Sequence, residues 1–136
     1  KVVFDTNIFI SAIIFGGNPR RCLELARTKE IELVASSAIL LELARKLKEK
    51  FSWSASEIID VIEGLSMFTK IVSPQKRIYK IKQEPADNRI LEAALEANVD
   101  YIVSGDKKHF LLLKSFKGIP IINATQFLQF FFKKTN

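Results

Sequence analysis

The chain has 136 residues, of which 48% are hydrophobic, and this size predicts a single domain spanning residues 1–136 around one core. Its formal charge of +6 favours a polyanionic partner such as nucleic acid, although a need for solubility alone would also explain the excess of basic over acidic residues. No apolar run approaches the ~20 residues of a membrane span, and the single Cys22 excludes an internal disulfide, which favours a cytoplasmic location.

Short apolar runs alternate with helical patterns along the chain. Strands are predicted over residues 1–4, 32–35, 69–72, 101–103 and 119–122. Helices are predicted over residues 8–15, 19–28, 37–50, 54–65, 85–98 and 123–132, whereas the basic stretch 76–84 has no assignable pattern. This alternation is typical of βαβ units, so we predict an α/β fold with three layers. Its central sheet should be mostly parallel, with about five strands and helices on both faces.

Two of the predicted strands run directly into a segment that ends in an aspartate. Val2–Phe4 precedes Asp5, and the strand at 101–103 is followed by Ser104, Gly105 and Asp106. In open α/β sheets the ligand crevice lies outside the carboxyl ends of the strands, so we expect Asp5 and Asp106 to face it together. Two carboxylates at one crevice need a metal or a shared proton to offset their repulsion.

Two further acids lie on predicted helices. Asp87 falls on the same helix face as Leu91 and Ala94, an unusual position for a carboxylate, although a first-turn acid also favours the helix dipole. Glu42 is predicted on the face opposite the apolar stripe of its helix, where an ordinary i,i+4 pair with Lys46 would explain it. Periodicity alone therefore selects Asp87 and leaves Glu42 without a role.

As an ordered set, these acidic segments resemble the motifs of the PIN-domain family. The resemblance rests on Asp5-Thr6-Asn7, Glu42, Asp87-Asn88 and Ser104-Gly105-Asp106, and it spans nearly the whole chain. The stretch from Pro85 to Lys107 is especially similar to the second half of that family. Within the family, the chain looks most like the VapC-like toxin components of toxin–antitoxin systems.

The resemblance implies a PIN-like fold and a metal-dependent ribonuclease. It implies that Asp5, Glu42, Asp87 and Asp106 hold Mg²⁺ or Mn²⁺, with Glu42 either a ligand or a group that positions the attacking water. Asn7 and Ser104 match positions that line the same pocket. Many relatives carry an additional Asp before the third motif, where this chain has Glu84.

Several partners follow from the same reading. RNA is the expected substrate, and the basic residues that could contact it are Arg89, Lys107 and Lys108. A cognate antitoxin protein is a further expected partner. The apolar C-terminal segment 127–134 would either pack on the sheet or form a homodimer or antitoxin surface. The alternative is a non-catalytic PIN-like module that binds RNA or protein.

A phosphatase of the haloacid-dehalogenase type also places an aspartate after its first strand. That chemistry requires a second acid two residues later, where this chain has Asn7. It requires another acid four residues after the late Gly-Asp pair, where this chain has Phe110. The sequence therefore favours the nuclease over the phosphatase.

Overall fold

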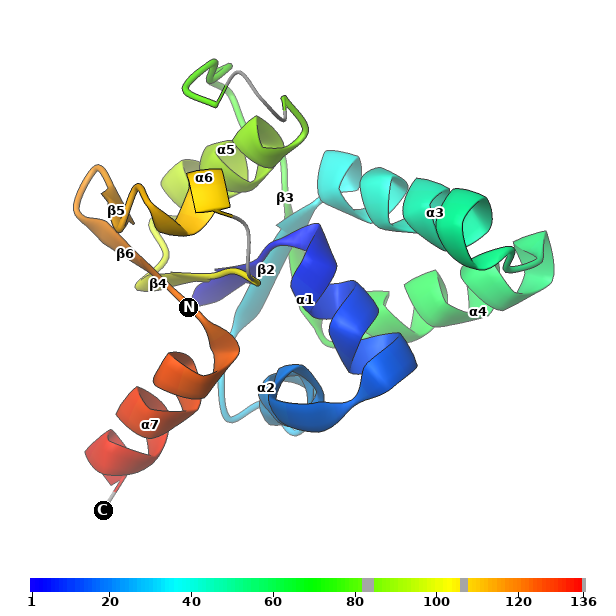
Figure 1. Ribbon diagram of the computed structural model, residues 1–136, viewed down its shortest axis with the longest axis horizontal. Helices are drawn as coiled ribbons and strands as arrows, with labels where there is room; N and C mark the ends of the chain where they lie inside the picture. The colour runs from blue at the N-terminus through cyan, green and yellow to red at the C-terminus, as the bar shows by residue number, and fades with distance from the viewer. Residues whose placement is uncertain (82–84, 106–107, 136) are drawn as a thin grey trace.

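The computed structural model describes residues 1–81, 85–105 and 108–135, with no side-chain description at 108, 109, 134 and 135 (Figure 1). The strands are β1 (Val2–Phe4), β2 (Leu33–Ser36), β3 (Thr69–Val72), β4 (Tyr101–Val103), β5 (Ser115–Phe116) and β6 (Ile119–Ile122). The helices are α1 (Thr6–Ile10), a π-helical turn η1 (Ser11–Phe15), α2 (Gly17–Arg27), α3 (Ser37–Phe51), α4 (Ala55–Ser66), α5 (Asp87–Ala97), α6 (Lys108–Leu111) and α7 (Ala124–Thr135).

The strands form one sheet in the order β3-β2-β1-β4-β6-β5. The first five in that order pair in parallel, and β5 pairs antiparallel with β6. β1 is central and every one of its residues is buried, which explains why it reads as a continuous apolar run. The predicted α/β fold with a mostly parallel sheet is thus confirmed.

The sheet has six strands in the described part of the chain rather than about five. The additional strand, β5, is only two residues long, too short for an alternating pattern to reveal it. It joins β6 through Lys117 and Gly118, which both have positive φ angles, of 48° and 82°. A two-residue hairpin turn of this kind needs positive φ at both positions, and glycine adopts it without a steric cost.

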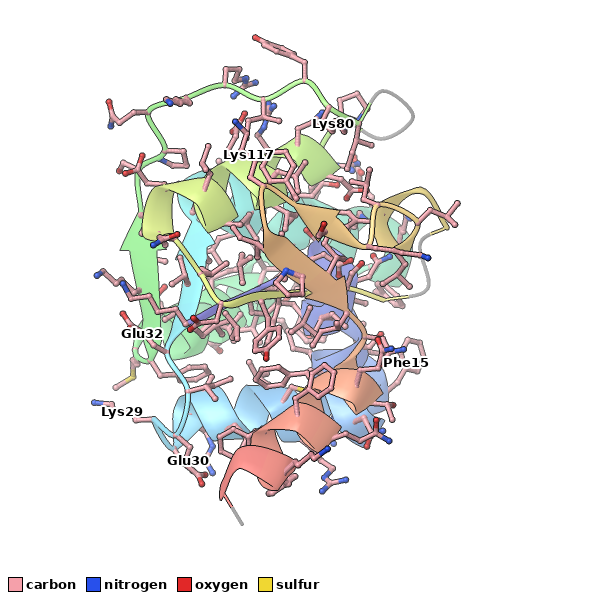
Figure 2. The ribbon with its side chains drawn as sticks, turned by 90° about the vertical axis from the view of Figure 1, so that its left-hand side faces the viewer. Phe15, Lys29, Glu30, Glu32, Lys80 and Lys117 are labelled. Carbon is pink, nitrogen blue, oxygen red and sulfur yellow. The ribbon has the colours of Figure 1, made fainter. Side chains whose placement is uncertain are left out.

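Helices cover both faces of the sheet. α5 packs against β1, β2 and β3 on one face. Figure 2, which views the molecule from the side, shows α5 on one side of the sheet and α2 and α7 on the other. Within the described ranges, none of the helices is both long and apolar enough to cross a membrane.

The C-terminal helix α7 divides its aromatic side chains between the core and the surface. Phe127 and Leu128 are buried, which confirms the predicted packing of this segment. The rings of Phe127 and Phe130 both contact Tyr101, with centroids 6.0 and 6.1 Å away. Phe130 and Phe132 remain partly exposed.

Helix α4 begins with the capping box that its sequence predicts. The backbone N–H of Glu57 donates to the Ser54 hydroxyl at 3.1 Å, and the Ser54 N–H donates to the Glu57 carboxylate at 2.9 Å. The backbone N–H of Ser54, and after it the Ser54 side chain, lowers the pKa of the Glu57 carboxyl. The cap therefore contributes stability above the ordinary glutamate pKa of 4.5 and loses it as the pH falls through the lowered value.

Ser54→Ala should therefore lower the free energy of unfolding by about 1 kcal/mol at neutral pH, as N-cap losses typically do. Urea unfolding of the variant and the parent would measure this difference. Glu57→Gln tests the charge instead: its destabilisation should shrink as the pH falls and the carboxylate protonates, and a loss that is independent of pH would contradict the contribution of that charge. Ser56→Ala is the control, because Ser56 lies in the same helix two residues after the capping residue.

The single cysteine joins two helices in the core. Cys22 lies on α2, and its Sγ is 3.7 Å from the Ala124 carbonyl oxygen at the start of α7. Burial raises the pKa of the Cys22 thiol from 9.0 to about 12. Because the unfolded thiol ionises first, the stability that this group contributes is complete below pH 9.0 and declines as the pH rises toward 12.

We expect Cys22 to resist alkylation by iodoacetamide in the folded protein at mildly alkaline pH. The thiolate is the reactive species, and burial suppresses both its formation and its access to the reagent. Mass spectrometry after timed labelling, with a urea-unfolded sample as the positive control, would measure the protection. Rapid labelling under native conditions would show that α2 and α7 separate readily.

Candidate acidic site at the carboxyl edge of the sheet

The ends of β1 and β4 bring Asp5 beside Ser104. In the parallel register Phe4 lies opposite Val103, so the next residue of each strand emerges at the same edge of the sheet. The Ser104 hydroxyl donates a short hydrogen bond to Asp5 Oδ2. The first and last motifs are therefore close to each other at Asp5 and Ser104, as predicted. Asp106 itself lies outside the described residues.

The Asp5 carboxylate is held by backbone as well as side-chain donors. Asp5 caps α1, because its Oδ1 accepts the Ile8 N–H at 2.9 Å, and its Oδ2 accepts the Gly105 N–H at 3.2 Å. The side chain is completely inaccessible to solvent. Hydrogen bonds of this kind favour the charged form of a carboxylate, so they offset part of the cost of burying it.

Asn7 lies at the same edge, in the first turn of α1. A Cβ placed on Gly105 would be 3.6 Å from the Asn7 Cβ, so the turn after β4 passes directly over this residue. The Asn7 side chain is partly buried. The structure thus brings together Asp5, Asn7 and Ser104, three of the predicted site residues.

Asp87 is buried in the first turn of α5. Its side chain is only 4% exposed, and Leu91 and Ala94 on the same helix face are fully buried. The predicted inward position of this carboxylate is therefore confirmed. Because α5 packs across β1 and contacts α3, the beginning of α5 lies at the edge where α1 and α3 also begin (Figure 1).

Glu42 lies on α3, but not on the exposed face that the periodicity predicts. Its side chain is 18% exposed, and its neighbours one turn away, Ile39 and Lys46, are both buried. Arg45 forms an ion pair with Glu42 at 2.5 Å and also pairs with Glu49. The Glu42 carboxylate, followed by Glu49, raises the pKa of the Arg45 guanidinium.

Lys46 is a site residue that the sequence analysis did not select. Its side chain is only 6% exposed, and its Nζ donates to the Asn7 Oδ1 at 3.3 Å. The one available signal was its position three residues after Leu43, at the margin of the apolar stripe of α3. A buried cation in this position adds positive charge beside the motif that carries Asp5.

The other predicted residues have different surroundings. Arg89 is mostly buried, and its guanidinium pairs with Glu92 at 2.9 Å and donates to the Ile78 carbonyl at 3.1 Å. These contacts make Arg89 part of the local structure, and its contact with RNA stays a prediction. Lys107 and Glu84 lie outside the described residues, and Lys108 begins α6 without a described side chain.

The side chains at this edge are chemically suited to a hard divalent cation. Asp5, Asp87 and Glu42 offer only oxygen donors, which Mg²⁺ and Mn²⁺ prefer over the nitrogen and sulfur ligands typical of zinc. Within residues 1–81, 85–105 and 108–135, no three carboxylate, imidazole or thiolate groups already form a metal-binding cluster. The donor chemistry therefore fits a cation, and the described side chains do not by themselves complete its coordination.

Comparisons with known proteins identify the family of this chain. The model of the PIN domain matches residues 1–108 of the chain. An uncharacterized protein of Methanocaldococcus jannaschii is 31% identical over 129 residues, which cover 90% of this chain and 81% of that protein. The family match includes Asp5, Glu42, Asp87 and Asp106 and ends before β5, β6 and α7.

Proposed function

Because this chain belongs to the PIN-domain family, a family generally of nucleases, we propose that it is a metal-dependent ribonuclease that hydrolyses phosphodiester bonds in RNA. The observation that carries the proposal is the pair of buried carboxylates, Asp5 and Asp87, on elements that meet at one edge of the sheet. Burying a carboxylate is costly, and a bound divalent cation would offset that cost at both positions.

We assign the residues to the following roles. Asp5, Asp87 and Asp106 hold Mg²⁺ or Mn²⁺, and Glu42 either joins them or positions the attacking water. A divalent cation bound there supplies activation of a water nucleophile and neutralisation of charge on the phosphate. Ser104 and the N–H groups of Ile8 and Gly105 fix the orientation of Asp5, since together they bond both of its oxygens.

Asn7 and Lys46 act as a second layer of the site. Asn7 accepts a hydrogen bond from Lys46, so the amide has a defined orientation at the pocket. Partners of this kind hold groups at a metal centre in place, and their loss typically lowers metal affinity or activity by about 10- to 100-fold.

The test is cleavage of a panel of single-stranded and structured RNAs by the purified protein. We expect products with Mg²⁺ or Mn²⁺ and none with EDTA. Calorimetric titration with Mn²⁺ supplies an independent readout of the site. Absence of both cleavage and Mn²⁺ binding would instead support the alternative, a non-catalytic PIN-like module that binds RNA or protein.

A finer part of the proposal concerns the biological role. The acidic motifs resemble those of VapC-like toxins, so we propose that the enzyme is the toxin of a toxin–antitoxin pair acting in the cytoplasm. Induced expression in a bacterial host should then arrest growth, and an inactive site variant should not. Growth at the normal rate with active protein present would favour a role in RNA maturation.

The partly exposed Phe130 and Phe132 support a homodimer or an antitoxin contact as a further proposal. Light scattering during size-exclusion chromatography would measure the mass of the purified chain. A Phe130→Ser, Phe132→Ser variant should convert a dimer to a monomer without loss of folding. A monomeric parent protein would leave the antitoxin as the proposed partner of this surface.

A further inference from the structure

A basic segment between β3 and α5 crosses the outer side of α5. We call residues 75–81 the basic strap. Its exposed side chains include Lys76, Arg77, Tyr79 and Lys80, whereas Ile81 is buried. Figure 2 shows the segment running over α5 at the surface, with Lys80 near its end.

The backbone of the basic strap is fixed by side chains of α5. The Gln75 N–H donates to Glu96 at 2.9 Å, and the Ile78 N–H donates to Glu92 at 2.9 Å. The acceptors are two positions of one stripe along α5, since residues four apart lie on the same helix face.

The third attachment lies at the end of the strap nearest the acidic site. The Ile81 N–H donates to Asn88 Oδ1 at 2.8 Å, and Asn88 Nδ2 donates to the Ile81 carbonyl at 2.7 Å. Asn88 follows Asp87 directly, in the first turn of α5. The strap therefore runs antiparallel to α5 and approaches the end of the helix that holds the buried carboxylate.

The attachments leave a regular pattern of exposed side chains. Backbone N–H groups at 75, 78 and 81 are bonded to α5, and the residues between them face solvent. Arg77 is 3.8 Å from Glu92, so its contact with this carboxylate is long and its side chain remains 60% exposed. Tyr79 is 74% exposed, so most of this large aromatic side chain contacts solvent.

From this placement we propose that the basic strap is a docking surface for single-stranded nucleic acid. Cations at 76, 77 and 80 neutralise phosphates, and the Tyr79 ring stacks on an unpaired base. A duplex offers its phosphates but keeps its bases stacked internally, so the exposed ring favours a single strand. This inference rests on the proposed nuclease function in one respect, which is that the strap would direct a bound strand toward the proposed site at Asp87.

Fluorescence anisotropy with a labelled oligouridine, in EDTA to prevent cleavage, tests the proposal. The Lys76→Ala, Arg77→Ala, Lys80→Ala variant should bind more weakly, and its log–log salt slope should be smaller by about two, because a single strand contributes roughly 0.7 per neutralised phosphate. Lys48→Ala, Lys50→Ala, Lys133→Ala removes the same charge from exposed positions on α3 and α7 and is the matched control.

Tyr79 has its own pair of variants. Tyr79→Ala should weaken binding by about 5- to 150-fold, whereas Tyr79→Phe keeps the ring and should bind nearly as the parent does. Circular dichroism and thermal unfolding would verify that each variant is folded. Equal losses in the strap variant and the charge control would overturn the inference, as would duplex binding as tight as single-strand binding.

The outcomes separate this inference from the proposed function. Strap-dependent binding without cleavage in Mg²⁺ or Mn²⁺ would retain the docking surface and reject the nuclease. Cleavage with binding that is unaffected in the strap variants would retain the nuclease and reject the docking surface. If the strap bound an acidic protein but no oligonucleotide, the proposed docking surface for nucleic acid would also be rejected.

Discussion

Asp5→Asn is expected to reduce RNA cleavage by more than about a hundredfold while the chain remains folded. Loss of groups that merely orient metal ligands already costs about 10- to 100-fold, and Asp5 is proposed to be a ligand itself. The substitution removes one negative charge and replaces one carboxylate oxygen with an NH₂ group. Initial rates with Mg²⁺ or Mn²⁺ would measure the loss.

The same substitution also has a structural effect that must be separated from catalysis. Asp5 accepts from Ile8 at Oδ1 and from Ser104 and Gly105 at Oδ2, whereas asparagine keeps only one accepting oxygen and therefore loses at least one of these bonds. We expect a lower unfolding temperature but an unchanged circular dichroism spectrum. Asp60→Asn on the exposed side of α4 makes the same chemical change without touching the site and should retain full activity. A folded Asp5→Asn protein with normal rates would contradict the assignment of Asp5.

Ser104→Ala distinguishes charge from orientation at this carboxylate. It removes the hydroxyl donor to Asp5 and leaves both acidic oxygens in place. An intermediate loss, smaller than that of Asp5→Asn, is expected if the hydroxyl only orients the ligand.

Asn88→Ala is expected to lower the free energy of unfolding by about 2–6 kcal/mol. Asn88 is 2% exposed, and its amide satisfies both the N–H and the carbonyl of Ile81. Alanine would leave these two buried backbone groups without the partners they have here, and each such group costs about 1–3 kcal/mol. The midpoint of urea unfolding would measure the destabilisation.

Local measurements connect this prediction to the basic strap. In the variant, hydrogen exchange at the Ile81 amide should accelerate well before global unfolding, since its acceptor is gone. Asn18→Ala is the control, because it removes only exposed hydrogen bonds, one to Thr125 and one from Arg21, and should change stability by less than about 1 kcal/mol. An Asn88→Ala protein with unchanged stability and exchange would mean that the strap is not held by this amide.

Elements with a strong local signal could be predicted from the sequence. The strands at β1 and β4 are buried runs of apolar residues, and the capping box at Ser54 uses neighbouring residues only. The inward position of Asp87 followed from helical periodicity, because its partners on that face are apolar. In each of these cases the information lies within a few residues of the position concerned.

The rest depends on contacts that no local pattern contains. Lys46 was not selected from the sequence, since periodicity cannot show that the Asn7 side chain of another helix accepts a hydrogen bond from its ammonium. For the same reason Glu42 was expected on the solvent face. The basic strap has no helical or strand period because its backbone N–H groups bond to side chains of α5 rather than to a neighbouring strand.

The buried ammonium of Lys46 has a consequence for the order in which the protein matures. A divalent ion binds in proportion to its concentration, whereas a lysine belongs to the chain and is present at any ion level. Part of the negative charge of the acidic site beside Asn7 is therefore compensated by Lys46 as soon as α1 and α3 pack together. In many small metalloproteins folding must wait for the ion. If the proposed ion binds at this site, assembly of the polypeptide and loading of the ion would be separate events, and folded, ion-free protein would be activated by supply of the ion alone.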